Sequence, residues 1–160
     1  MRHLWTPWRM DYIRGPKPQE CVFCAKIEGD DERELVIARG HNVYVTMNKY
    51  PYNNGHLLVV PHAHVPSLED LSDQDLLEMM RLTATALQVL RRTMAPDGFN
   101  IGINIGAEAG AGVREHVHLH IVPRWSADSN FMSVLASTRV IPQLLEETYR
   151  EVKAGWKASG

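Results

Sequence analysis

Three histidines recur at alternate positions in the segment EHVHLHIVPRW, which spans residues 115–125. They are His116, His118 and His120, and aliphatic residues occupy the positions between them. Because successive side chains of a β-strand point to opposite faces, this spacing predicts three imidazoles on one face and aliphatic side chains on the other. A half-buried strand usually carries hydroxyl or lysine side chains on its polar face. A row of imidazoles therefore indicates a chemical role.

The histidine row has three interpretations. It can be a surface strand that carries histidines by chance, which the strict alternation disfavours. It can be a metal site, because two imidazoles two residues apart on a strand are a common way to present nitrogen ligands to zinc or iron. It can also be a nucleophilic site, in which one neutral imidazole attacks phosphorus while its other nitrogen donates to a carbonyl. The residues alone leave the last two open.

The size and charge of the chain limit its class. With 160 residues it fits one domain, predicted over 1–160 with an aromatic N-terminal arm at 1–20 and a C-terminal helix and tail at 139–160. The formal net charge of −2 gives no broad basic surface for nucleic acid or an anionic membrane, although it is compatible with a local phosphate pocket. No apolar run approaches the roughly 20 residues that span a membrane, so we expect a cytoplasmic protein.

Five short segments are typical of strands. They are rich in β-branched residues or alternate between apolar and polar residues, and they lie at 35–38, 42–47, 56–61, 99–105 and 115–125. The connections between them are short enough for hairpins. We therefore expect an α+β fold with a mainly antiparallel five-stranded sheet.

Two further segments predict the main helices. Ser72 can cap a helix that continues to Met94. Its apolar stripe, which should face the sheet, contains Leu76, Met80, Leu87 and Leu90. A second amphipathic helix is expected from about 140 to 152, with Pro142 in its first turn.

The two cysteines of the chain, Cys21 and Cys24, form a CxxC pair. Two cysteines are too few for a secreted disulfide framework. The spacing suits half of a zinc site, a redox pair or two buried thiols, and one CxxC does not decide among them. His62, His64 and the first histidine of the row are candidate partners for a metal.

The segment from His116 to Val122 resembles the signature of the histidine triad (HIT) family, three histidines separated by single apolar residues. The resemblance extends to LWTPWRMDYI, NKYPYNNGHLLVVP, DSNF and VIPQLL, which are similar to the diadenosine-tetraphosphate phosphorylase branch and its nucleotide-hydrolase relatives. It therefore covers almost the whole chain. It implies a HIT-like fold, in which the sheet of one protomer joins that of a second protomer in a homodimer.

The resemblance also implies a role for each matching residue. His118 would be the nucleophile that attacks the α-phosphorus of a nucleotide and forms a nucleotidyl-histidine. His120 would contact the phosphate and the bridging oxygen of the leaving group, and His56 would be a buried partner of the site. Asn48 would reach the ribose hydroxyls, and Asn104 would hold phosphate.

The loops around these residues have plainer interpretations as well. Asn48 taken alone is typical of a turn before Pro51. The loop at 106–112 contains Gly110 and Gly112 and can present backbone N–H groups to phosphate oxygens, or it can be a hairpin connection without a ligand. Related enzymes commonly place a hydroxyl or amide side chain where Gly112 stands. This departure leaves the leaving-group contacts and the preferred substrate open.

Some HIT relatives bind zinc through a CxxC pair, a histidine after the third strand and the first histidine of the row. The ligands implied here are Cys21, Cys24, His64 and His116. A site closed by four protein ligands has no open position, so this zinc would be structural rather than a Lewis acid. No organic cofactor is expected.

The leading prediction is an enzyme that transfers a nucleotidyl group, AMP, from a dinucleoside polyphosphate to inorganic phosphate or water in two covalent steps. The glycine loop, with Arg114 and Arg124 on either side of the histidine strand, favours phosphate as the acceptor. One alternative is a nucleoside phosphoramidate hydrolase. Another is a zinc-dependent nucleotide-binding module that acts through its dimer surface without turnover.

Overall fold

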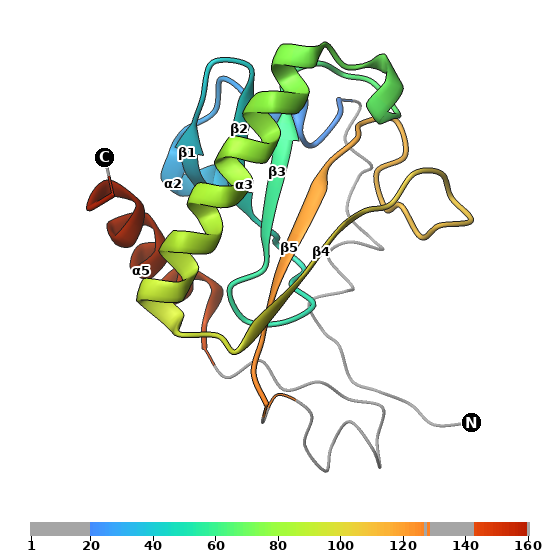
Figure 1. The fold of residues 1–160 in the computed structure, drawn as a ribbon. Helices are drawn as coiled ribbons and strands as arrows, with labels where there is room; N and C mark the ends of the chain where they lie inside the picture. The colour runs from blue at the N-terminus through green and yellow to red at the C-terminus, as the bar shows by residue number, and fades with distance from the viewer. Residues whose placement is uncertain (1–19, 127, 129–142, 160) are drawn as a thin grey trace.

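The computed structural model describes residues 20–126, 128 and 143–159. Within them five strands form one antiparallel sheet in the order β1-β2-β3-β5-β4 (Figure 1). The strands are β1 (Val36–Arg39), β2 (Val43–Met47), β3 (Leu57–Pro61), β4 (Gly98–Ile103) and β5 (Leu119–Arg124). The predicted α+β class and the five-stranded sheet are confirmed.

The main helices are α3 (Asp73–Met94) and α5 (Leu145–Lys157). They pack on one face of the sheet, where a large apolar cluster fills the space between the helices and the strands (Figure 1). Shorter helical segments precede them, namely η1 (Cys24–Lys26), α2 (Asp31–Glu34) and η2 (Leu68–Asp70). No helix in the described ranges is long and apolar enough to cross a membrane. The cytoplasmic location stays a prediction.

Ser72 caps α3 as predicted. Its hydroxyl accepts from the backbone N–H of Asp75, and the carboxylate of Asp75 accepts from the backbone N–H of Ser72, which forms a capping box. The predicted apolar stripe is wrong at Met80, which is 57% exposed. The stripe that faces the sheet includes Thr83, whose hydroxyl donates to the carbonyl of Met79 at 2.7 Å. A hydroxyl that donates a hydrogen bond within its own helix can be buried, whereas hydropathy alone predicts that it is exposed.

The second helix is displaced from its expected position. Its described part begins at Leu145 and continues to Lys157, beyond the expected end at 152, because Trp156 still packs against the core. Pro142 and nearly all of the predicted N-terminal arm lie outside the described residues. The single-domain boundaries stay a prediction.

The histidine strand is shorter than expected, because β5 begins only at Leu119. Its neighbour β3 ends at Pro61, which has no N–H with which to continue the ladder. The backbone N–H of Val117 donates instead to the carbonyl of Val65 at 2.7 Å. His116 and His118 therefore precede the strand, and His116 lies in a bend. β4 also ends earlier than expected, at Ile103.

Candidate functional site

The three histidines of the row lie buried on the sheet face opposite the helices. His116, His118 and His120 are 0%, 4% and 9% exposed. The rings of His118 and His120 contact each other, with centroids 4.8 Å apart. The intervening side chains at 117, 119 and 121 belong to the apolar cluster under the helices. The predicted separation of imidazoles and aliphatic side chains is confirmed.

The proton on the His118 ring is placed by the backbone. Its Nδ1 lies 2.9 Å from the carbonyl oxygen of His116. Because a carbonyl only accepts, Nδ1 carries the proton and Nε2 of the neutral ring keeps its lone pair. Burial lowers the pKa of His118, although the bond to the His116 carbonyl opposes this shift. Near neutral pH the ring can therefore act as a nucleophile through Nε2.

A separate chain of hydrogen bonds sets the proton on His120. The backbone N–H of Tyr52 donates to Nδ1 of His56 at 3.0 Å, so neutral His56 carries its proton on Nε2. That nitrogen lies 2.9 Å from Nδ1 of His120, which must accept. The proton of His120 is therefore on Nε2. The neighbouring rings of His118 and His120 present opposite functions, a lone pair and an N–H donor.

Burial keeps this chain neutral. Burial, followed by the nearby His120 and His118, lowers the pKa of His56 to about 3. Burial, followed by His118, lowers the pKa of His120 to about 4. Charging either ring would place a cation in poorly hydrated surroundings. At neutral pH His120 is therefore an N–H donor rather than an imidazolium ion.

Asn48 lies in the loop that leads from β2 to His56. Its side-chain amide nitrogen lies 3.3 Å from Nδ1 of His56, and its Oδ1 accepts from the backbone N–H of Tyr50 at 3.0 Å. Both polar ends of the Asn48 side chain therefore stabilise the loop. This is the role that we expect for an asparagine in a turn before Pro51. Contact with a ribose stays a prediction.

Asn104 and the glycine loop lie in the connection between β4 and the histidine row. The last pair of the ladder is Ile103 with Leu119, so Asn104 directly follows the end of β4, and His118 directly precedes the start of β5. In the loop, Gly110 has a φ of 85°, in the left-handed region that favours glycine. A Cβ at Gly112 would meet no atom within 4 Å, so the space beside it is open. Phosphate binding here stays a prediction.

Two aromatic rings that the sequence prediction omitted line the histidines. The ring of Phe23 lies 4.6 Å from that of His118, measured between centroids. The ring of Tyr52 stacks on His120 with centroids 5.6 Å apart and an interplanar angle of 12°. Phe23 stands between the two cysteines and Tyr52 stands four residues before His56. Both lie in segments where we predicted other functional residues, namely the two cysteines and His56.

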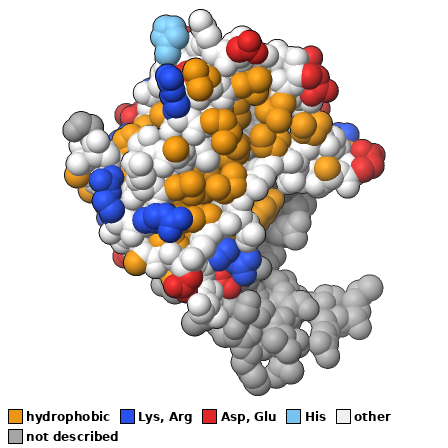
Figure 2. Space-filling view, viewed as in Figure 1, with side chains coloured by type: hydrophobic (Ala, Val, Ile, Leu, Met, Phe, Trp, Pro, Cys, Tyr) orange, Lys and Arg blue, Asp and Glu red, His pale blue; other side chains and the backbone are white. Residues whose placement is uncertain are grey.

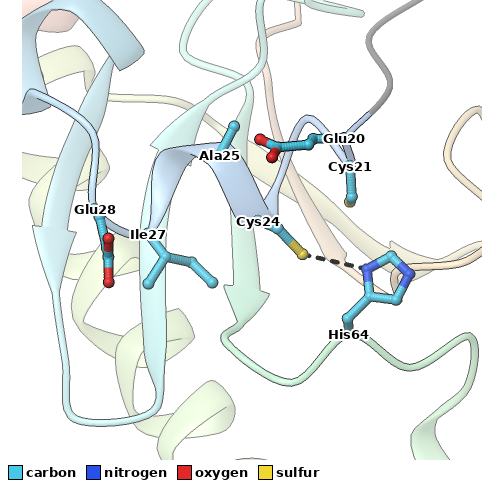
Figure 3. A pocket seen from close by; sticks show the side chains of 7 residues that line it. All are labelled: Glu20, Cys21, Cys24, Ala25, Ile27, Glu28 and His64. Carbon is cyan, nitrogen blue, oxygen red and sulfur yellow. Dashed lines mark hydrogen bonds between the residues drawn. The ribbon is translucent and has the colours of Figure 1, made fainter.

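The residues predicted as metal ligands come together from three separate segments. One ligand atom from each of Cys21, Cys24, His64 and His116 lies within 4.8 Å of the others. Figure 3 shows Cys24 and His64 directed toward each other, with Cys21 beside them. His62 is not in this cluster; its ring lies near that of Tyr44, with centroids 6.0 Å apart.

The distances within the cluster fit tetrahedral coordination. Cys24 Sγ lies 3.2 Å from His64 Nδ1 and 3.6 Å from His116 Nδ1, and Cys21 Sγ lies 3.4 Å from His116 Nδ1. In a tetrahedral zinc site, a sulfur and a nitrogen ligand are about 3.5 Å apart. Nε2 of His116 lies 2.8 Å from the carbonyl of Pro61, so Nε2 carries the proton and Nδ1 keeps a lone pair for a metal.

Arg124, which the sequence suggested for an acceptor phosphate, is engaged elsewhere. It donates from Nε to Asp128 at 2.6 Å and from a terminal nitrogen to Asn100 at 2.9 Å. These bonds tie the end of β5 to β4 and to the following turn. The structure therefore does not support a part for Arg124 in holding the acceptor.

Comparison with known proteins identifies the family. The model of the HIT domain matches residues 30–127. The chain belongs to the HIT family. An "AP-4-A phosphorylase" of Mycobacterium tuberculosis is 42% identical over 98% of this chain and 85% of its own length. A "Bis(5'-nucleosyl)-tetraphosphatase [asymmetrical]" of Schizosaccharomyces pombe is 39% identical over 51% of this chain and 44% of its own length.

A solved HIT-family structure supports the fold. The crystal structure of a Zn-bound histidine triad family protein from Mycobacterium smegmatis is similar with a TM-score of 0.69 and 29% identity, over 87% of this chain and 94% of that one. The matched domain at 30–127 includes the histidine row but not Cys21 and Cys24. The CxxC pair thus lies outside the part of the chain that defines the family.

Proposed function

We propose that this HIT-family protein is an enzyme that transfers AMP from a dinucleoside polyphosphate through a covalent intermediate on His118. The observation that carries the proposal is the set of hydrogen bonds that assigns a lone pair to His118 and an N–H to His120, on rings 4.8 Å apart. The similarity to an AP-4-A phosphorylase supports the substrate class. The expected substrate is diadenosine tetraphosphate.

In the first step, Nε2 of His118 attacks the α-phosphorus of the AMP group. A phosphorus–nitrogen bond forms while the phosphorus–oxygen bond to the departing ATP breaks. The proton on Nδ1 stays hydrogen-bonded to the carbonyl of His116, which stabilises the charge that the ring acquires. Nε2–H of His120 donates a hydrogen bond to the bridging oxygen and stabilises the negative charge that develops there as ATP departs as an anion. His56 holds His120 in this orientation.

In the second step, an acceptor oxygen attacks the same phosphorus, breaks the bond to nitrogen and regenerates His118. Phosphate as acceptor yields ADP, whereas water yields AMP. The open space beside Gly112 suits an anionic acceptor. The N–H groups of Gly110 and Ala111 donate within the loop, so other N–H groups of 106–112 would hold the acceptor. We therefore place phosphorolysis first and hydrolysis second.

Isotope-labelled inorganic phosphate tests the reaction and the acceptor together. We expect label in ADP, with unlabelled ATP as the second product, because phosphate attacks the AMP group on His118. The measurement is mass spectrometry of the nucleotides formed from diadenosine tetraphosphate. A matched reaction contains chloride at equal ionic strength, which provides charge but cannot form a nucleotide product. Unlabelled AMP and ATP at every phosphate concentration would instead identify a hydrolase.

The two alternative functions are distinguished by assaying an AMP–amine conjugate beside the tetraphosphate. Release of an amine from an AMP–amine conjugate, faster than cleavage of the tetraphosphate, would indicate a phosphoramidate hydrolase. Tight nucleotide binding with no product from either substrate would indicate a binding module. The His118–His120 arrangement suits either enzyme, because both reactions displace a group from the α-phosphorus.

We further propose that Cys21, Cys24, His64 and His116 hold a structural zinc ion. Four protein ligands leave no position for a substrate, so the metal would stabilise the site rather than polarise a phosphate. Burial, and then the neighbouring Cys21, raise the pKa of the Cys24 thiol. A zinc ion would offset this by stabilising the thiolate. The proposed displacement at phosphorus needs no organic cofactor.

We also propose a homodimer that joins two sheets through β4. In the described part of the chain, β4 pairs on one side only, which leaves a free sheet edge. Ile101 on this strand is 46% exposed, and Leu77 and Met80 on α3 are 52% and 57% exposed. Figure 2 shows apolar side chains gathered over this face. An open strand edge beside an apolar patch is typical of an association surface.

Replacing Ile101 with aspartate is expected to convert the dimer to a monomer. The change places a charge at the free edge of β4, where burial in an interface would leave it unpaired. The measurement is the molar mass by sedimentation or light scattering across a range of concentrations. Leu144→Asp is the matched control, because Leu144 is a 66% exposed apolar residue at the start of α5. A dimer that tolerates Ile101→Asp would place the interface elsewhere.

A further inference from the structure

The CxxC segment contributes an aromatic ring to the site as well as two sulfur atoms. Phe23 lies between the cysteines, is 5% exposed and belongs to a small apolar cluster on the histidine face of the sheet. Its ring centroid lies 4.6 Å from that of His118 at an interplanar angle of 50°, and 5.4 Å from that of His116. A residue near the N-terminus therefore packs directly against the proposed nucleophile.

The His118 ring needs a packing contact of this kind. Its hydrogen bond from Nδ1 to the carbonyl of His116 places one ring atom but permits the ring to tilt about that bond. Nε2 lies on the other side of the ring, so a tilt moves the attacking atom away from the phosphorus. Contacts with the rings of Phe23 and His120 restrict this tilt.

Phe23 is itself tied to the sheet. Its carbonyl accepts a hydrogen bond of 2.8 Å from the hydroxyl of Tyr44, whose side chain is fully buried on β2. The same carbonyl accepts from the backbone N–H of Lys26 at 3.2 Å. The ring is thus attached to a rigid element, which a positioning contact requires.

We propose that Phe23 is a positioning residue that holds the His118 imidazole in line for attack on phosphorus. The inference rests on the proposed function and deepens it, because it assigns the orientation of the nucleophile to a residue outside the matched HIT domain. A displacement of about 1 Å at a reacting atom can lower a rate by about 10²-fold. Because the proposed role acts through the orientation of His118 and not through binding, kcat should change while KM does not.

The test compares three variants of the full chain. Phe23→Leu keeps a buried apolar side chain but removes the flat ring, and we expect kcat to fall by about 10²-fold with KM unchanged. Phe23→Tyr keeps the ring and should recover most of kcat. Val36→Ala is the matched control, because Val36 lies in the same apolar cluster but on β1, which two strands separate from β5. Bound zinc and the thermal midpoint are measured for each variant.

Either wild-type kcat in Phe23→Leu or an equal loss in Val36→Ala would overturn the proposal. If Phe23→Leu does not fold, Tyr44→Phe takes its place, because it removes the bond to the Phe23 carbonyl while keeping the ring of residue 44. This variant should lower kcat by a smaller factor, and an unchanged kcat there would also overturn the proposal.

A spectroscopic measurement separates this inference from the proposed function. The Phe23 ring should shift the NMR signals of the His118 ring protons through its ring current, and Phe23→Leu should abolish that shift. This result does not depend on turnover. An inactive wild-type protein with the shift present would refute the proposed function but leave the contact intact. An active protein without the shift would refute the positioning role alone.

Discussion

Replacement of His118 by alanine is expected to lower turnover by roughly 10⁴- to 10⁶-fold, because it removes the attacking atom of a covalent mechanism. Since the side chain is only 4% exposed, the alanine variant should also lose some stability through the cavity it leaves. His118→Asn tests the chemistry with less disturbance, since its amide can still donate toward the carbonyl of His116. The measurement is kcat on diadenosine tetraphosphate, with the thermal midpoint recorded in parallel.

His41→Ala is the matched control for the loss of an imidazole. His41 is exposed in the turn between β1 and β2, and we expect its removal to leave turnover unchanged. Acid-labile adducts provide a direct check, because wild-type protein quenched with substrate should carry AMP on the peptide that contains His118. If both His118 variants keep most of the wild-type activity, the covalent mechanism is wrong.

The second large effect is expected on stability, when zinc is removed or a ligand is lost. A ligand present at a thousand times its Kd stabilises the folded state by about 4 kcal/mol. For a chain of this size that corresponds to a fall in the thermal midpoint of roughly 8–16 °C. We expect a loss of this order in Cys24→Ser and on chelation of the wild-type protein, measured by thermal unfolding.

Val22→Ser is the control for the cysteine variant. Val22 lies in the same turn, is 41% exposed and is not part of the cluster, so the change should have little effect on the midpoint. Chelation should lower the midpoint of Val22→Ser but not that of Cys24→Ser, which has already lost the site. Protein purified without chelator that contains no metal, with both thiols freely titratable, would eliminate the zinc site.

His116 connects the proposed metal site to the proposed chemistry. Its ring contributes Nδ1 to the cysteine cluster, while its backbone carbonyl accepts the hydrogen bond from Nδ1–H of His118 that sets the tautomer of that ring. Phe23 makes a second connection, from the CxxC turn to the same nucleophile. Loss of zinc should therefore impair catalysis through the orientation of His118, without any direct contact between metal and substrate.

Much of the fold could be predicted from local patterns, and the errors have local causes. The cap at Ser72 was predictable because a capping box needs only residues three apart. The exposed position of Met80 was not, because the face that a helix buries depends on the sheet it meets. The late start of β5 was also not predicted, since it depends on where Pro61 falls in a neighbouring strand.

The sequence by itself determined the two faces of the histidine row and the residue types available for chemistry, because the alternation of a strand is a property of the local backbone. Only the tertiary structure decided which nitrogen of each ring carries the proton. That assignment depends on the carbonyl of His116 and on the N–H of Tyr52 relayed through His56, all at distances of 2.9 or 3.0 Å. The contact of Phe23 with His118 likewise arises when the chain folds back on itself. Hydrogen bonding and ring packing act over a few ångströms, so partners distant in sequence become defined only once the sheet has formed.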